Sequence, residues 1–324
     1  MDKFLSCDWG TSLFRLKVVK IPGLEIIAEE NSDEGIAKTF ELWKQIRQSE
    51  EFRMSFYIDI LQQNIKALQK KSDISLDRSP VIISGMASST MGLINLPYKE
   101  FPFGADGSDL NTKIIEADND FKHKIIIISG AKTTDDAVRG EETQLAGCYR
   151  DIAEEKKQLF IFPGTHSKHV VVKGKKAIAI NTYMTGEFFE LLSKKSILSV
   201  SLEEGNDLQS EKNLQSFQKG INDCLRSNLL HTSFIVRTNH LFGKLSKQEN
   251  YYYLSGLLIG TEMKELIDDD YYSDITLVSN SNLNSYYETA FKILNRDEPI
   301  LKIENADRAT IAGQVKILNR LIRV

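Results

Sequence analysis

The chain has no long hydrophobic run. Its longest purely aliphatic stretch, Ile125 to Ile128, is far shorter than the roughly 20 apolar residues that a membrane helix requires. The N-terminal region also lacks the basic segment, apolar core and small-residue cleavage site of a secretory signal. We therefore expect a cytoplasmic protein that has no membrane partner.

Cysteine is scarce, and neither sign of charge is in excess. The three cysteines, Cys7, Cys148 and Cys224, are widely spaced and form no metal-binding or redox motif. We expect all three to be buried small residues in a reducing compartment. Lys and Arg number 41 against 45 Asp and Glu, which gives a net charge of −4. This balance provides no general attraction to nucleic acid.

What the chain does have is an alternation of strand-like and helix-like segments over its 324 residues. That alternation predicts an α/β protein, and the length exceeds what one hydrophobic core usually covers. The charged stretch at 151–157 is typical of a solvated connection between domains. We therefore predict an N-terminal domain over residues 1–155 and a C-terminal domain over residues 156–324.

The positions of the predicted elements follow from hydrophobic periodicity and turn residues. Period-two or wholly apolar runs predict strands over 3–8, 14–20, 24–30, 81–83, 125–128, 159–162, 169–173, 176–181, 275–278 and 300–303. Helical spacing of apolar residues predicts helices over 54–71, 139–149, 186–195, 214–229, 248–267 and 306–320.

The first two predicted strands are joined by a turn that could bind phosphate. The first strand ends in Asp8, and Gly10, Thr11 and Ser12 form the turn. A carboxylate in this place can anchor hydrated Mg²⁺, while turn amides and hydroxyls can donate to phosphate oxygens. A plain hairpin, in which Asp8 and Thr11 satisfy their own backbone, remains an equal alternative on this motif alone.

A second turn of the same kind opens the C-terminal half. There the strand over 159–162 leads into Pro163-Gly164-Thr165-His166 and then into the strand over 169–173. Two Gly-Thr turns in separate halves could grip one polyphosphate from opposite sides. This repetition favours phosphate binding over a plain hairpin.

Several blocks of sequence, taken together and in this order, resemble the 2-dehydro-3-deoxygalactonokinase family. Besides the two turns, the blocks are Ser84 to Ser89 (SGMASS), Arg139 to Gly147 (RGEETQLAG), Met184 to Leu192 (MTGEFFELL) and Leu254 to Gly260 (LSGLLIG). The resemblance implies two ribonuclease-H-like domains of the actin-like ATPase type facing a central cleft. The helix over 306–324 would pack back toward the N-terminal domain or the nucleotide site.

The resemblance also implies an activity. The C-terminal domain would hold ATP and the N-terminal domain the sugar acid. The γ-phosphoryl group would pass to the terminal hydroxyl of 2-dehydro-3-deoxy-D-galactonate. The resulting 6-phosphate would then be cleaved by an aldolase in galactonate catabolism.

Residue roles in nucleotide binding can be assigned from the matching positions. Asp8 would anchor Mg²⁺, mostly through water. Residues expected near ATP are Gly10, Thr11 and Ser12 in the first turn, Gly164, Thr165, His166 and Lys168 in the second, and Ser279 and Asn280 in an adenosine loop. This loop is more polar than is usual in the superfamily, and His169 stands where the family usually has Trp.

A carboxylate must take the proton of the substrate hydroxyl as the bond to phosphorus forms. We predict Glu141 for this role, because related sugar kinases carry a Gly-Asp where this chain has Gly140-Glu141. The alternative is that Glu141 and Glu142 only favour the positive end of their helix. Asp136 and Glu142 are the other candidates for the base.

The sugar acid is expected at a strand end that presents small hydroxyl residues. Candidates for substrate binding are Gly85, Met86, Ser88, Ser89, Arg139 and Glu142. Arg139 could pair with the substrate carboxylate, unless it is a solvated surface arginine. Ser88 or Ser89 could instead cap a helix.

Other functions remain open on the sequence alone. The chain could phosphorylate another sugar acid or a hexose, because single hydroxyl contacts can dominate discrimination. A non-catalytic nucleotide-binding switch is disfavoured by the presence of Asp8, both Gly-Thr turns and Glu141. A homodimer is left open.

Overall fold

The computed structural model describes residues 2–46, 49–150, 156–205, 207–266, 272–280, 283–294 and 300–322. Contacts divide the chain into two compact units. The first unit comprises Met1–Ile152, Lys175–Ile180 and Ala306–Val324, and the second comprises Ala153–Gly174 and Asn181–Asn305. Most of the predicted linker, residues 151–155, lies outside the described residues.

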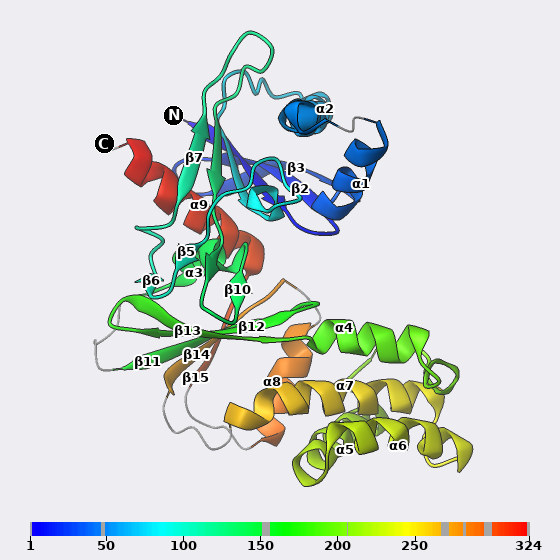
Figure 1. Cartoon of the computed structure of the whole chain (residues 1–324). Coiled ribbons are helices and arrows are strands. Elements are labelled where there is room, and N and C mark those ends of the chain that lie inside the picture. Colours follow the sequence, from blue (N-terminus) through cyan, green and yellow to red (C-terminus); the bar gives the residue numbers. More distant parts are fainter. Residues whose placement is uncertain are drawn as a thin grey trace. The chain divides into compact units, whose positions relative to one another are not determined.

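The first unit is built on a mixed sheet (Figure 1). Its strands are β1 (Lys3–Trp9), β2 (Phe14–Lys20), β3 (Glu25–Ser32), β4 (Val81–Gly85), β5 (Lys99–Glu100), β6 (Phe103–Gly104), β7 (Thr112–Ile115), β8 (Ile125–Ile128), β9 (Ala131–Lys132) and β10 (Ala137–Val138). Its helices are α1 (Ile36–Ile46), α2 (Arg53–Ser72), α3 (Glu141–Cys148) and α9 (Ala306–Ile322), with short 3₁₀ turns at Glu50–Phe52 and Met86–Ser88. The main sheet has the order β3-β2-β1-β4-β8-β7, and a small sheet has the order β10-β9-β5.

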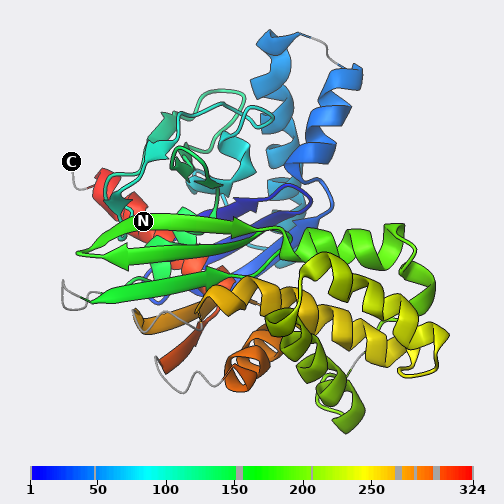
Figure 2. The ribbon, with the colours of Figure 1, turned by 60° about the horizontal axis from the view of Figure 1, so that its bottom comes forward.

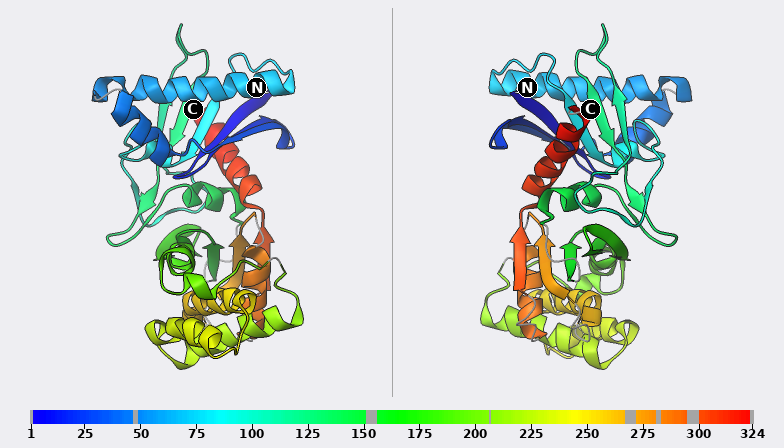
Figure 3. Two further views of the ribbon diagram at one scale, coloured as in Figure 1. Left: turned by 90° about the vertical axis from the view of Figure 1, so that its right-hand side faces the viewer. Right: turned by 90° about the vertical axis from the view of Figure 1, so that its left-hand side faces the viewer.

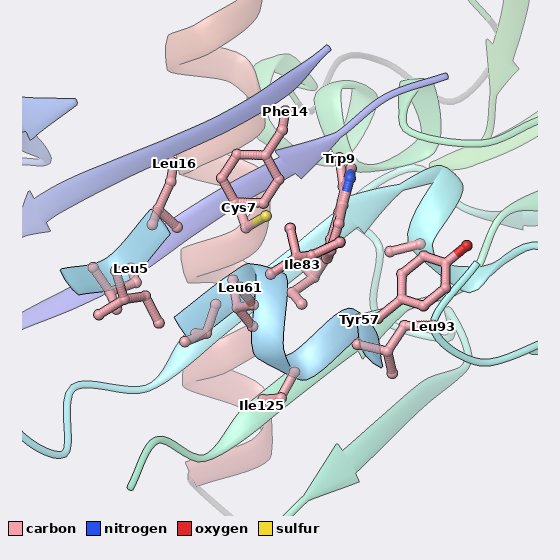
Figure 4. Packing of buried hydrophobic residues seen from close by; sticks show 14 of the residues in the cluster. Leu5, Cys7, Trp9, Phe14, Leu16, Tyr57, Leu61, Ile83, Leu93 and Ile125 are labelled. Carbon is pink, nitrogen blue, oxygen red and sulfur yellow. The ribbon is translucent and has the colours of Figure 1, made fainter. Parts of the chain in front are cut away.

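The core of the first unit lies between this sheet and α2, as Figure 4 shows. Buried residues of α2 recur every three or four positions, so that one face of the helix is apolar. Tyr57 and Leu61 of that face pack with Cys7, Trp9 and Phe14 of the β1–β2 hairpin. The expected burial of Cys7 is confirmed, and Cys224 is buried too, whereas Cys148 is only partly buried, contrary to the prediction.

Helix α9 lies against α3 and contacts β1 and β4 (Figure 3). The Gln314 side chain of α9 is buried, and its amide nitrogen donates to the Cys7 carbonyl and to the Ser84 hydroxyl, both at 3.0 Å. These two hydrogen bonds hold helix α9 against β1 and β4 next to Asp8 and Gly85.

The second unit repeats the strand arrangement of the first. Its strands are β11 (Lys157–Phe162), β12 (Ser167–Lys173), β14 (Tyr272–Val278), β15 (Ile300–Glu304) and the end of β13 (Lys176–Tyr183), of which Lys176–Ile180 belongs to the first unit. The sheet order is β15-β14-β11-β12-β13-β6. In both sheets an antiparallel β-hairpin starts from a central strand, which pairs in parallel with a later strand on its other side. This is the ribonuclease-H-like arrangement, so the predicted α/β fold class is confirmed.

Helices of the second unit gather beside this sheet, as Figure 2 shows. They are α4 (Thr185–Glu190), followed by a π-helical turn (Leu191–Lys195), α5 (Glu211–Arg226), α6 (Leu229–Leu241), α7 (Lys247–Met263) and α8 (Leu283–Ile293), with 3₁₀ turns at Ser199–Ser201 and Lys264–Leu266. Helix α7 begins with a capping box between Ser246 and Glu249. In the part of the chain that the structure describes, no helix is long and apolar enough to cross a membrane.

Candidate functional site

The first predicted phosphate turn is a tight hairpin between β1 and β2. Asp8 stands opposite Arg15 in the strand pairing, and the Arg15 guanidinium donates to Asp8 Oδ2 at 2.8 Å. Gly10 N–H donates to the Leu13 carbonyl at 2.9 Å and closes the turn. Thr11 and Ser12 are exposed at its tip. Their hydroxyls are thus accessible to a ligand, whereas Asp8 is held in place.

The surroundings of Asp8 disfavour the ionised form of its carboxylate. Burial raises its pKa above the ordinary value, Arg15 works in the opposite direction, and Asp307 of α9 adds to the rise. Asp307 is itself paired with the buried Lys17 of β2. A positive charge beside Asp8, such as that of Arg15, offsets the cost of its ionised form.

Gly85 at the end of β4 leaves room beside Asp8. Its φ of +90° is rare for other residues. A Cβ at this position would lie 2.8 Å from the Trp9 carbonyl oxygen and 3.2 Å from Asp8 Oδ1. Glycine is therefore required both for the backbone turn and for space next to Asp8 Oδ1.

The residues around Asp8 fit Mg²⁺ held by one carboxylate. Mg²⁺ keeps several waters and is usually bound through one or two carboxylates plus substrate phosphates. Within the described ranges, no group of three or more His, Cys, Asp or Glu side chains could hold a metal on its own. Asp8, with Oδ2 bound to Arg15, can meet this requirement through Oδ1.

The second predicted phosphate turn opens into a cavity of the second unit. Gly164 and Thr165 lie between β11 and β12 and line a cavity of about 620 Å³. Other walls come from α4, α7 and α8, and they include the aromatic rings of Tyr251 and Tyr286. A cavity of this size, partly aromatic and partly polar, is in the range of small-molecule and cofactor sites.

Helix α4 holds the second turn from one side. Glu187 N–H donates to the Thr165 carbonyl at 2.9 Å, and the Glu187 carboxylate lies 2.5 Å from His166 Nε2. A Cβ on Gly186 would lie only 2.5 Å from the Gly164 carbonyl oxygen. The start of α4 therefore touches the backbone of the turn and fixes its shape.

The remaining predicted nucleotide residues lie in different surroundings. Lys168 is buried within β12. Ser279 follows β14, where its N–H donates to the Glu304 carbonyl at 3.0 Å, and Asn280 is exposed. Among the described residues, neither Ser279 nor Asn280 lines the large cavity, and residues 281–282 of the predicted adenosine loop lie outside those residues.

The predicted sugar-acid residues come together in the first unit. The segment Gly85 to Ser89 meets Arg139, whose guanidinium donates to the Ser88 hydroxyl at 2.7 Å and to the Ser88 carbonyl. The same guanidinium lies over the Tyr98 ring, 4.1 Å from its centre. Arg139 is therefore an ordered residue of this site and not a freely solvated arginine. Met86 and Ser88 bound the short 3₁₀ turn that follows Gly85.

Two side-chain atoms in the same region lack hydrogen-bond partners among the described residues. Within the described part of the chain, Ser89 Oγ and Arg139 Nε are both buried and have no hydrogen-bond partner. Unpaired buried polar atoms are costly and are often accounted for by a ligand or water. The arrangement can therefore accept polar oxygens of a substrate.

Three carboxylates were candidates for the base, and the structure gives each a different environment. Glu141 is partly buried at the start of α3 and accepts from Arg139 N–H at 3.0 Å. Glu142 is 1% exposed and accepts from Gly140 N–H at 2.7 Å. Asp136 caps the β9–β10 turn by accepting from the N–H of Ala137 at 2.8 Å.

Burial, reinforced by the neighbouring Glu141, raises the pKa of Glu142 to about 7. The buried Glu142 holds the turn at Gly140, whereas the partly exposed Glu141 is the more accessible of the pair.

Two charged residues of the site escaped sequence reasoning. Arg15 could have been recognised, because residues two positions either side of a short hairpin turn face each other across the strands. Glu262 of α7 is a buried carboxylate that contacts β12, α4 and α8. Its only sequence signal is an acid within an otherwise apolar helical segment.

Comparison with known proteins gives consistent matches over most of the chain. The profile of a family described as 2-keto-3-deoxy-galactonokinase matches residues 8–317. A 2-dehydro-3-deoxygalactonokinase from Escherichia coli (strain K12) is 32% identical over 243 residues, covering 72% of this chain and 78% of its own length. A protein of Rhizobium meliloti (strain 1021), provisionally named as the same kinase, is 27% identical over 326 residues, covering 97% of each chain.

A solved structure is similar over the whole chain as well. The crystal structure of a Sinorhizobium meliloti protein, provisionally assigned as a 2-dehydro-3-deoxygalactonokinase, has a TM-score of 0.79 and 26% identity. The match covers 99% of this chain and 100% of that one.

Proposed function

Because the chain belongs to the 2-keto-3-deoxy-galactonokinase family, we propose that it transfers the γ-phosphoryl group of ATP to the 6-hydroxyl of 2-dehydro-3-deoxy-D-galactonate. The observation that carries this proposal is the cavity of about 620 Å³ at the Gly164–Thr165 turn. It is large enough for a nucleotide, and the Gly164–Thr165 turn lines one part of it.

In this proposal the second unit binds ATP. The phosphates lie against Gly164 and Thr165, with His166 nearby, and the base and ribose occupy the part of the cavity bounded by Tyr251 and Tyr286. Aromatic walls are suited to a nucleobase because every base has a flat π-face. Lys168, Ser279 and Asn280 take part only if the nucleotide extends beyond this cavity.

The first unit supplies the metal anchor. Asp8 holds Mg²⁺ largely through water, and the exposed Thr11 and Ser12 hydroxyls and the Gly10 backbone contact the transferring phosphate. When bound, Mg²⁺ neutralises part of the negative charge that develops on the phosphate oxygens. Arg15 keeps the Asp8 carboxylate oriented.

The sugar acid binds where the segment Gly85 to Ser89 meets Arg139. The guanidinium pairs with the substrate carboxylate, and Tyr98 holds it in place from behind. Ser89 Oγ, which is buried without a partner among the described residues, serves a substrate hydroxyl or keto oxygen.

Glu141 takes the proton of the attacking hydroxyl. It stands at the start of α3 next to Arg139, and it is more exposed than Glu142. Glu142 supports the turn from within, and Asp136 is the reserve base. A general base of this type contributes roughly 10²- to 10⁴-fold in rate.

We place the reaction in the cytoplasm, where ATP is available. A homodimer remains an alternative to a monomer, and light scattering at the enzyme concentration of the assay decides between them.

Product analysis tests the proposed reaction. After incubation with ATP, Mg²⁺ and 2-dehydro-3-deoxy-D-galactonate, phosphorus NMR and mass spectrometry should find one 6-phosphate for each ADP released. ADP formed without a phosphorylated sugar acid would instead indicate a nucleotide-hydrolysing switch. Faster phosphorylation of a hexose or another sugar acid would retain the chemistry and reject the substrate.

A further inference from the structure

Glu262 lies near the end of α7, where its carboxylate is the meeting point of four hydrogen-bond donors. Oε1 accepts from Ser167 Oγ at 2.6 Å and from His169 Nε2 at 2.9 Å. Oε2 accepts from Thr185 Oγ1 at 2.5 Å and from Tyr287 Oη at 2.8 Å. Both carboxylate oxygens are thus fully engaged by side chains distant in sequence.

The carboxylate is buried yet remains suited to the ionised form. Glu262 is 2% exposed, and burial alone would raise its pKa. The hydrogen bond and electrostatic attraction of His169, together with the hydrogen bonds from Ser167 and Thr185, outweigh burial and hold the pKa below its ordinary value. Charge-assisted hydrogen bonds of this kind are roughly twice as strong as neutral ones. The Glu262 carboxylate therefore holds its four donors firmly together.

The four donors come from three elements that surround the second phosphate turn. Ser167 and His169 begin β12 directly after Gly164 to His166. Thr185 begins α4, and Tyr287 lies on α8, which runs beside α7 (Figure 1). Thr185 and Tyr287 also line the large cavity, as do Gly164 and Thr165. One side chain therefore ties the turn to two walls of the cavity.

We infer that Glu262 is a positioning residue for the nucleotide phosphates: it holds the Gly164–Thr165 turn in register with α4 and α8 so that the turn amides face the phosphate chain. This inference rests on the proposed use of the cavity for ATP. Glu262 itself lies behind the turn and acts through Ser167 and Thr185.

If Glu262 positions the phosphates, its loss has an effect that loss of a merely structural residue would not have. Ligands with a phosphate chain should lose affinity when the contacts of Glu262 are weakened, because the turn amides move away from the phosphate oxygens. Adenosine has no phosphate and uses only the aromatic part of the cavity, so its affinity should change little.

The test compares ATP, ADP and adenosine binding by calorimetry to the full chain and to Glu262→Gln. In glutamine an NH₂ group replaces one carboxylate oxygen, so it cannot accept from the two donors that bind that oxygen. We expect the dissociation constants of ATP and ADP to rise at least about tenfold, while that of adenosine changes less than about twofold and the KM of the sugar acid is unchanged. The matched control is Glu265→Gln, which neutralises an exposed carboxylate three positions further on that accepts from Tyr183 Oη at 3.1 Å. This control should bind all three ligands as the wild type does.

Equal loss of adenosine and ATP affinity in Glu262→Gln, or no loss of either, overturns the inference. If the wild type binds ATP no more tightly than adenosine, the proposed nucleotide site itself fails. Should Glu262→Gln not fold, Ser167→Ala removes a single donor and should weaken ATP roughly threefold to tenfold without affecting adenosine. Unchanged ATP binding by Ser167→Ala would also contradict the positioning role.

Discussion

The contact between Gly186 and the second phosphate turn gives a prediction that can be worked out from distances. Replacing Gly186 with alanine adds a Cβ at 2.5 Å from the Gly164 carbonyl oxygen and 2.8 Å from Thr165 Cα. Ordinary contacts of a Cβ begin at 3.4 Å, so the turn and the start of α4 must separate by about 0.9 Å. Both partners are backbone atoms, which cannot rotate out of the way.

This displacement would move the atoms of the turn that bind the phosphates in the proposal. A misplacement of about 1 Å can cost about 100-fold in rate, which corresponds to about 2.7 kcal/mol of transition-state stabilisation. We expect Gly186→Ala to lower kcat/KM for ATP about 100-fold in a coupled ADP-release assay. Circular dichroism should stay close to that of the wild type, while the thermal midpoint should fall by a few degrees, because overpacking of this kind costs about 1 to 3 kcal/mol.

Gly243→Ala is the matched control, because it makes the same substitution at the end of α6, away from the cavity. Gly243 has a φ of +61°, and a Cβ there would meet no atom within 4 Å. Backbone strain of about 1 to 2 kcal/mol should lower stability and leave activity unchanged. If Gly186→Ala keeps kcat/KM within about threefold of the wild type, the assignment of this turn to the phosphates is refuted.

Three further predictions concern the carboxylates of the first unit. Asp8→Asn should lower kcat by about 10²- to 10³-fold with an unchanged circular dichroism spectrum, and wild-type turnover would exclude Asp8 as the metal anchor. Glu141→Gln should lower kcat by about 10²- to 10⁴-fold while calorimetry finds ATP affinity intact, and a larger loss in Asp136→Asn would transfer the role of base to Asp136. The pKa of Glu142 is about 7 in the folded chain against an ordinary 4.5, so the folded chain retains a proton that the unfolded chain has released. The free energy of unfolding should therefore fall by up to about 3 kcal/mol as the pH rises from about 5 to 8. In urea titrations of Glu142→Gln, the free energy of unfolding should not fall over this pH range. An equal fall in that variant would show that Glu142 is not the group responsible.

Most of the longer strands and the amphipathic helix α2 could be predicted from sequence because their signals are local. Helices α1 and α8 and the strands β5, β6, β7, β9 and β10 were not predicted. Alternation at Phe14 and Leu16 indicated β2, and the spacing of Leu61 and Leu68 indicated α2. Helix α6 gave no such signal. Its apolar residues point in several directions, with Leu230 83% exposed and Val236 fully buried, so no single apolar face stands out.

Sequence reasoning could propose candidate site residues where they stand in short motifs, and it could not do so where residues distant in sequence meet. Both Gly-Thr turns are contiguous in sequence and were recognised. The partners of Glu262 are 25 to 95 positions away, so no local pattern could bring them together. The adenosine loop at Ser279 and Asn280 was inferred from its place after a strand, whereas the cavity walls from α7 and α8 depend on how those helices pack.

The central claim is that this chain phosphorylates a 2-keto-3-deoxy sugar acid. Its most direct test is ADP release measured with Mg²⁺ and ATP across a panel of 2-keto-3-deoxy sugar acids and common hexoses. We predict the highest kcat/KM for 2-dehydro-3-deoxy-D-galactonate and almost no ADP release without an acceptor. A hexose used more efficiently than every sugar acid, or ADP release that does not depend on the acceptor, would contradict the account.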